Sequence, residues 1–172
     1  PDGDRLGVVA KHDGEYVLMS GNQSAAVYLE YILSELKKQG KLPANAVMYN
    51  TIVTSDLGEL VSKSYGVEVE KTLTGFKFIG DKIRKYEKTK EKEFIFGYEE
   101  SYGCVVKDFV RDKDAVQAVV MAAEAGNFYK HQGKDLIDVL NELYAKHGTF
   151  KESQIALSKA GAEGAKRIKE IM

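Results

Sequence analysis

Short apolar runs alternate with segments of helical hydrophobic spacing along most of the chain. Two runs with strand-like composition, residues 6–12 and 15–19, flank Asp13-Gly14. An Asp-Gly pair between such runs is typical of a two-residue hairpin. After Gly21-Asn22, apolar residues recur every three or four positions up to Lys38, and Gly40 follows. This pattern predicts an opening β-hairpin and then an amphipathic helix that ends with basic residues and a glycine.

The middle of the chain repeats strand and helix in turn. Runs rich in β-branched and aromatic residues predict buried strands over 47–54, 67–72 and 94–98. Helical spacing predicts helices over 57–65 and 76–86, and Asp56 with Glu59 predicts a capping box at the first of them. The almost wholly charged segment 87–93 is predicted to be a solvated loop.

Two long helices and a shorter one are predicted for the last third. The first is capped by Asp114 with Gln117, and its run AVVMAAEA has apolar residues on so many sides that we expect deep coverage. The second runs through 136–144 to end near Gly148. Residues 150–157 are predicted to form a strand, and the last helix follows Gly161. The alternation predicts an α/β fold, a three-layer αβα sandwich with a mixed sheet.

Composition narrows the class of protein. The 172 residues hold 25 Lys and Arg against 26 Asp and Glu, a net charge of -1, which argues against nucleic-acid binding. A fraction of 44% hydrophobic and 30% charged residues is typical of a globular protein. Because no apolar run approaches the roughly 18 residues of a membrane span, we expect a cytoplasmic protein without a membrane partner. Cys104 is interpreted as buried filler, and His12, His131 and His147 as surface or structural residues.

Three loops carry groups that can do chemistry. In PDGDR (1–5), the carboxylates of Asp2 and Asp4 can converge on one hard cation such as Mg²⁺, and Arg5 suits a phosphate oxygen. In TLTGFKFIG (72–80), Gly75 permits close approach of a ligand and Lys77 can meet an anion near a helix N-terminus. Taken singly, the first loop is better explained as an Asp-Gly turn, and the second as a helix start capped by Thr74.

The third loop, GYEESYG (97–103), follows an apolar strand. Ligands of open α/β sheets bind beyond the carboxyl ends of strands, and a carboxylate accepts hydrogen bonds from neighbouring sugar hydroxyls. Glu99, Glu100 and Ser101 therefore make a candidate carbohydrate-binding loop. The alternative interpretation is a surface loop with an incidental acid pair.

Together, in this order and spacing, the three loops resemble the α-D-phosphohexomutase superfamily, and within it the phosphoglucomutase branch. RDKDA (111–115) resembles the lysine-bearing turn that follows in the family, and EGAKRIKEIM resembles the lead-in to its last domain. The resemblance implies four domains around a cleft. By it, residues 1–20 would be the tail of the metal-loop domain, a hairpin from the neighbouring domain. Residues 21–158 would be the sugar-binding third domain, and 159–172 the lead-in to a fourth.

The resemblance also implies roles for individual residues. Asp2 and Asp4 match two of three metal aspartates, Thr74 and Gly75 match the turn that orients the sugar, and Glu99 and Ser101 match the pair that holds its hydroxyls. Lys113 and Arg5 are the implied catalytic residues, with Lys113 near the transferred phosphoryl group as either a charge or a proton donor. The implied cofactor is Mg²⁺ and the implied substrate a hexose phosphate.

Two motifs of the family are absent from the printed sequence, namely a TASHNP-like phosphoserine segment and an RPSGTEP-like phosphate loop. We therefore expect a fragment that is inactive alone and that works with the remaining domains of the same polypeptide. The implied activity of the whole enzyme is interconversion of glucose 1-phosphate and glucose 6-phosphate through a phosphoserine and a bisphosphate intermediate. The alternatives are a phosphomannomutase or dual-specificity enzyme, and a non-catalytic sugar-binding module.

Overall fold

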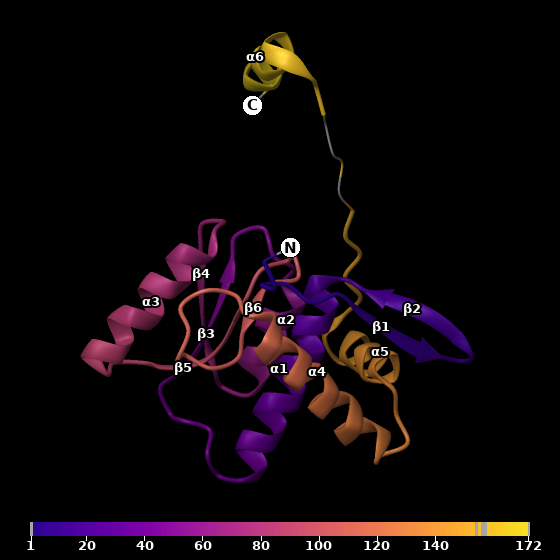
Figure 1. Ribbon diagram of the computed structural model, residues 1–172. Coiled ribbons are helices and arrows are strands. Elements are labelled where there is room, and N and C mark those ends of the chain that lie inside the picture. Colours follow the sequence, from indigo (N-terminus) through magenta and orange to yellow (C-terminus); the bar gives the residue numbers. More distant parts are fainter. Residues whose placement is uncertain (1, 154, 156–157, 172) are drawn as a thin grey trace.

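The alternation of strands and helices predicted from the sequence is confirmed by the computed structural model, which describes residues 2–153, 155 and 158–171 (Figure 1). The elements, in chain order, are β1 (Val8–His12), β2 (Glu15–Met19), α1 (Gly21–Lys38), β3 (Ala46–Thr51), α2 (Leu57–Ser64), β4 (Glu68–Thr72), α3 (Phe76–Thr89), β5 (Glu93–Tyr98), β6 (Cys104–Val105), α4 (Ala115–Lys130), α5 (Leu136–His147) and α6 (Gly161–Ile171).

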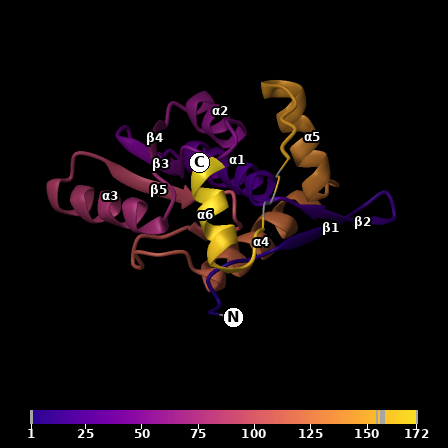
Figure 2. The same cartoon turned by 90° about the horizontal axis from the view of Figure 1, so that it is seen from above.

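A mixed sheet of four strands, in the order β4-β3-β5-β6, forms the middle layer. β3 is parallel to both β4 and β5, and β6 returns antiparallel to β5. Side chains alternate across β3, so Val47 and Tyr49 pack with α3 while Met48 faces the larger core that includes α1. Viewed from above, α2 and α3 flank the strands on opposite sides (Figure 2). The predicted αβα sandwich is thereby confirmed.

The predicted hairpin is also confirmed, as β1 and β2 pair around the Asp13-Gly14 turn. The following helix begins earlier than the sequence suggested. Ser20 and Gln23 form a reciprocal capping box, so Gly21 and Asn22 are the first helical residues and not a turn. This early start places Gly21 beside the loop after β5.

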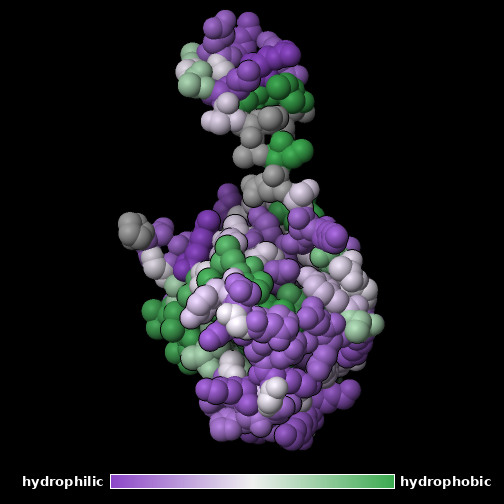
Figure 3. All heavy atoms as spheres, turned by 90° about the vertical axis from the view of Figure 1, so that its right-hand side faces the viewer, coloured by the Kyte–Doolittle hydropathy of each residue, from purple (hydrophilic) through white to green (hydrophobic). Residues whose placement is uncertain are grey.

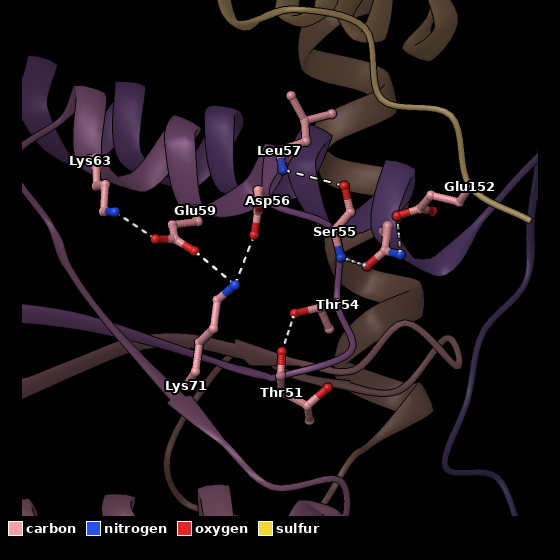
Figure 4. A network of polar contacts seen from close by, with 10 residues as sticks. Thr51, Thr54, Ser55, Asp56, Leu57, Glu59, Lys63, Lys71 and Glu152 are labelled. Carbon is pink, nitrogen blue, oxygen red and sulfur yellow. Dashed lines mark hydrogen bonds and ion pairs between the residues drawn. The ribbon is translucent and has the colours of Figure 1, made fainter.

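The capping box predicted from Asp56 and Glu59 is wrong. Both carboxylates bind Lys71 of β4, with Nζ to Oδ1 and Oε2 distances of 2.8 and 3.1 Å. The side chain of Asp56 makes no cap hydrogen bond, and the hydroxyl of Ser55 accepts from the N–H of Leu57 instead (Figure 4). An ion pair with a lysine from the neighbouring strand has displaced the local cap.

The charged segment 87–93 is a solvated loop only in part. Its first three residues form the last turn of α3, Lys90 ends that helix in the left-handed region, and Glu93 begins β5. Lys92 forms ion pairs with Glu68 and Glu70 of β4. Burial alone would raise the pKa of Glu70, but hydrogen bonds from Lys82, Lys92 and Tyr86 lower it to about 2.

The expectation that α4 is deeply covered is wrong for one side of the helix. Val116, Val119 and Val120 are 73%, 51% and 60% exposed, while Ala118, Met121 and Ala125 are buried against the core. The cap predicted from Asp114 and Gln117 is confirmed only for Asp114, whose side chain accepts from the N–H of Val116. Gln117 instead accepts hydrogen bonds from the N–H groups of residues 106 and 107. Hydrophobic side chains do reach the surface of the main body in Figure 3.

The segment after α5 differs from the prediction. Residues 150–153 form no strand, and the remainder of the predicted strand over 150–157 includes positions 154, 156 and 157, which lie outside the described residues. Glu152 accepts a hydrogen bond from Asn22 at 2.8 Å (Figure 4). The last predicted helix is confirmed as α6, which lies apart from the main body in Figure 1.

Cys104 is buried at the start of β6, as expected, and burial raises the pKa of its thiol to about 12. Such a thiol is not a reactive nucleophile at neutral pH. None of the helices within the described ranges combines the length and the apolar character needed to cross a bilayer.

The hairpin is joined to α5 through the side chain of His12. His12 Nδ1 lies 2.9 Å from Asp135 Oδ2, and Asp138 and Asp13 lie 3.8 and 3.5 Å from the ring. The hydrogen bond with Asp135 raises the pKa of His12 above its ordinary value of 6.5. A raised histidine pKa stabilises the fold fully below the unfolded-state pKa, and this stabilisation is lost as the pH rises through the folded-state pKa.

We therefore expect the midpoint for urea unfolding of wild type to exceed that of His12→Gln at about pH 5.5, with the difference shrinking above about pH 7. Urea titrations of both proteins at several pH values measure it. His131→Gln is the matched control, because His131 is exposed at the end of α4. A His12→Gln deficit that stays constant across this range would contradict the predicted ion pair.

Candidate functional site

The candidate site lies at the carboxyl edge of the parallel strands, where the loops after β3, β4 and β5 meet. The backbone N–H of Ile52, just after β3, donates to Thr72 at the end of β4. Thr51 at the end of β3 donates to Glu100 Oε2 at 3.4 Å. Loops at this edge are the usual ligand-binding positions of open α/β sheets.

Glu99 is the most enclosed acid of the site. Its side chain lies at the end of β5, the residue is only 5% exposed, and Oε1 accepts a hydrogen bond from the backbone N–H of Gly75 at 2.9 Å. Gly75 precedes α3 with φ of 120° and ψ of 119°, a backbone conformation that glycine adopts readily. The structure therefore brings Glu99 and Gly75 together from loops 24 residues apart.

The other two residues predicted to contact the sugar lie nearby without a comparable bond. Thr74 is exposed directly before Gly75, and Ser101 is half-buried two residues after Glu99. The loop itself is closed by a hydrogen bond from the N–H of Glu99 to the carbonyl of Gly103 at 2.9 Å. Tyr102, inside it, adopts φ of 69°, a left-handed conformation that is uncommon for a residue other than glycine.

Asp4 and Lys113 form the second contact of the site. Lys113 Nζ lies 3.0 Å from Asp4 Oδ2, and the lysine side chain is 17% exposed. The hydrogen bond from Lys113 holds the pKa of Asp4 below its usual range, and the same bond raises the pKa of Lys113. Lys113 is therefore a fixed positive charge at neutral pH. Sequence reasoning missed Asp112, whose Oδ1 lies 3.4 Å from the same ammonium group.

The remaining predicted residues of the first loop are more exposed. Asp2 and Arg5 are both exposed, and Arg5 Nε lies 3.8 Å from Asp4 Oδ2. Asp2, Asp4 and Lys113 line an open groove of about 830 Å³ beside α3, which Lys77 and Arg111 also line. A groove of this volume is in the range of small-ligand sites.

Backbone hydrogen bonds join the segment before β1 to the third loop and to the start of α4. Leu6 donates to the carbonyl of Tyr102 at 3.3 Å, and Ala115 donates to the carbonyl of Gly3 at 3.2 Å. The segment before β1 is thereby held between the loop after β5 and the start of α4. All predicted site residues thus belong to one connected group of loops.

The acidic residues of this group do not complete a metal site. Within the described part of the chain, the set of three ligand side chains that converges is His12, Asp135 and Asp138, away from these loops. Both aspartates there already cap the N-terminus of α5. Asp2 and Asp4 offer oxygen ligands of the type a hard cation prefers, but two carboxylates are fewer than such a cation usually takes. The residues present fit part of a Mg²⁺ site.

Comparison with known proteins identifies relatives over the whole chain. A phosphoglucomutase from Staphylococcus epidermidis is 36% identical over 173 aligned residues, which cover 100% of this chain and 31% of that protein. A phosphoglucomutase from Staphylococcus aureus is 35% identical and is covered to 30%. The chain therefore spans about a third of the length of these relatives.

Solved structures share the fold. Parafusin, a phosphoglucomutase from Paramecium in an open form, matches 86% of this chain with a TM-score of 0.61 at 21% identity, over 24% of its own chain. A phosphoglucomutase/phosphomannomutase family protein from Burkholderia thailandensis matches 83% of this chain with a TM-score of 0.54 at 23% identity, over 27% of its own chain.

The family model for the phosphoglucomutase/phosphomannomutase α/β/α domain III matches residues 20–147. This match contains the four-stranded sheet, the loop with Glu99 and the turn with Lys113. It confirms the resemblance inferred from the three loops. The chain belongs to the phosphoglucomutase/phosphomannomutase family, and it contains the third domain of that family.

Proposed function

We propose that this chain is the sugar-binding part of an enzyme that interconverts glucose 1-phosphate and glucose 6-phosphate. The observation that carries the proposal is the buried carboxylate of Glu99, oriented by Gly75 at the edge of the sheet where ligands bind. The full-length relatives at 36% and 35% identity bear the name phosphoglucomutase, which favours glucose phosphates as substrates.

In this proposal, Glu99 and Ser101 hold the sugar hydroxyls. The hydrogen bond from the N–H of Gly75 to Oε1 restrains the orientation of the carboxylate, whose oxygens can accept bonds from neighbouring sugar hydroxyls. Thr74 and Gly75, on the other side of the hydrogen bond between Gly75 and Glu99, orient the sugar. Because vicinal hydroxyls look alike from either end of the sugar, one loop can accept both monophosphates.

Asp2 and Asp4 would hold Mg²⁺ in the whole enzyme, together with ligands from elsewhere in the polypeptide. When bound, the ion neutralises charge on the phosphoryl group being transferred. Lys113 adds positive charge beside it, and Arg5 is placed to bind a phosphate oxygen. The raised pKa of Lys113 favours the role of a fixed charge over that of a proton donor.

The proposed domain division follows from the same family assignment. Residues 21–158 would form the sugar-binding domain, which the family model supports over 20–147. The hairpin within 1–20 would belong to the metal-loop domain, since its two strands form a sheet separate from the main one. Residues 159–172, which include the detached α6, would lead into the next domain.

A phosphomannomutase is the second candidate, because the family description names both activities. Turnover of glucose 1-phosphate and mannose 1-phosphate by the full-length enzyme distinguishes the two. We expect the larger kcat/KM with glucose 1-phosphate, and no mutase activity from the 172-residue chain alone, whose printed sequence contains no phosphoserine segment. A large preference for mannose 1-phosphate would contradict the substrate assignment. The absence of both activities would favour a non-catalytic sugar-binding module.

A further inference from the structure

The hydrocarbon stem of Lys113 lies flat on the backbone of Gly103. A Cβ atom placed on Gly103 would lie 2.5 Å from Cδ of Lys113, 3.2 Å from its Cβ and 3.4 Å from its Cγ. Carbon atoms in contact normally sit about 3.5–4.0 Å apart. Any side chain larger than hydrogen at position 103 would therefore push the stem away.

The requirement for glycine comes from this contact and not from the backbone. Gly103 does not belong to the residues with a positive φ, so no left-handed backbone conformation requires glycine there. The neighbouring backbone is nevertheless fixed, because the carbonyl of Gly103 accepts from Glu99 and the carbonyl of Cys104 accepts from Asp114 at 3.0 Å. The stem of Lys113 is held against a rigid surface.

Gly103 also lies between the two halves of the site. It closes the loop that carries Glu99, and the lysine that crosses it reaches Asp4 at 3.0 Å. Gly80 of α3 supports the same turn, since a Cβ there would lie 2.4 Å from the carbonyl oxygen of Arg111. The position of the ammonium group thus depends on close approaches that only glycine permits.

We propose that Gly103 is a positioning residue that aims Lys113 at Asp4 and so at the transferred phosphoryl group. The part concerning the phosphoryl group rests on the proposed function. The part concerning the lysine rests only on the contacts above.

The test compares Gly103→Ala with Gly126→Ala in the full-length enzyme. Gly126 lies in α4, has an ordinary φ, and an added Cβ there would meet no heavy atom within 4 Å. We expect Gly103→Ala to lower kcat roughly ten- to a hundredfold, since misplacement by about 1 Å can cost that much. Gly126→Ala should leave kcat unchanged. Acetylation of Lys113 by acetic anhydride, followed by mass spectrometry, should be faster in Gly103→Ala than in either other protein.

A double-mutant cycle separates positioning from a general structural effect. In a Lys113→Ala background the stem is gone, so Gly103→Ala should cause little further loss of kcat. An equal loss in both backgrounds, or unchanged acetylation of Lys113 in Gly103→Ala, would overturn the proposal. Should Gly103→Ala fail to fold, recovery of folded protein in the double variant would support it, and no recovery would overturn it.

The two proposals fail in different ways. Faster acetylation of Lys113 with undiminished mutase activity would keep Gly103 as the positioning residue and remove Lys113 from the proposed mechanism. Slower turnover without any change in acetylation would leave the proposed function intact and overturn the role of Gly103.

Discussion

Replacing Glu99 by alanine in the full-length enzyme is expected to lower kcat/KM about a hundredfold, because misplaced reacting groups lose that much rate. The carboxylate is buried, and one of its oxygens accepts from Gly75. Its removal would delete the proposed sugar contacts and also release the start of α3 from the loop after β5. Steady-state kinetics with glucose 1-phosphate measure the loss.

Two further variants identify which property of Glu99 matters. Glu99→Gln keeps an oxygen that can accept from Gly75 but removes the charge, so it tests hydroxyl binding while preserving the contact between loops. Glu100→Ala is the comparison variant from the same loop, because the proposed function assigns the sugar hydroxyls to Glu99 and Ser101 and not to Glu100. Glu100 is less buried than Glu99 and meets Thr51 through one long contact of 3.4 Å. Activity of Glu99→Ala within about twofold of wild type would contradict the proposed role, because a lost orienting contact costs far more.

Periodicity predicted most of the fold because the elements here are locally consistent. The buried run of β3 and the apolar positions of α3, which recur every three or four residues, are signals contained within a short stretch of sequence. The hairpin was predictable for the same reason, since Asp13-Gly14 supplies the two positive φ angles that its turn requires. Each element then packs its apolar face against the other elements.

The errors arose where a distant residue changed a local preference. Asp56 and Glu59 have the spacing of a capping box, but Lys71 of the adjacent strand binds both carboxylates. The outward side of α4 is apolar in sequence and yet exposed. Among the described residues, α4 packs against the core with its other side, and Val116 and Val120 point away from that core. Neither the missing capping box of α2 nor the exposed valines of α4 can be predicted from the sequence of the helix concerned.

The site shows the same division between local and distant information. The loops that hold Asp4, Gly75 and Glu99 can be predicted from residue types at short spacing, whereas the turn with Lys113 is predicted only through the resemblance to the family. The contacts between them were not predictable, since Gly75 meets Glu99 and Asp4 meets Lys113 only once the sheet places their loops at one edge. Glycines that admit another segment, such as Gly103, leave no mark in the sequence beyond the glycine itself.

Gly21→Ala should lower both the stability of the chain and the activity of the full-length enzyme, because Gly21 also admits another segment of the chain. Gly21 is the first residue of α1, and a Cβ there would lie 2.2 Å from the carbonyl oxygen of Glu100 and 2.7 Å from the backbone nitrogen of Tyr102. Both atoms belong to the backbone, so no rotation of a side chain can relieve the overlap. The loop after β5, which carries Glu99, must move away from α1, or α1 must move away from this loop.

We therefore expect Gly21→Ala to lower the free energy of unfolding by about 1–3 kcal/mol through overpacking, although alanine is by itself the better helix former by about 1 kcal/mol. In the full-length enzyme it should also lower kcat/KM roughly a hundredfold, since Glu99 belongs to the displaced loop. Urea denaturation of the 172-residue chain and kinetics of the enzyme measure the two effects. Gly126→Ala, which meets open space in α4, should stabilise the chain and spare activity. A stabilised and fully active Gly21→Ala protein would contradict the prediction. It would show that the added Cβ does not displace the loop after β5 and that the higher helix propensity of alanine is the whole effect.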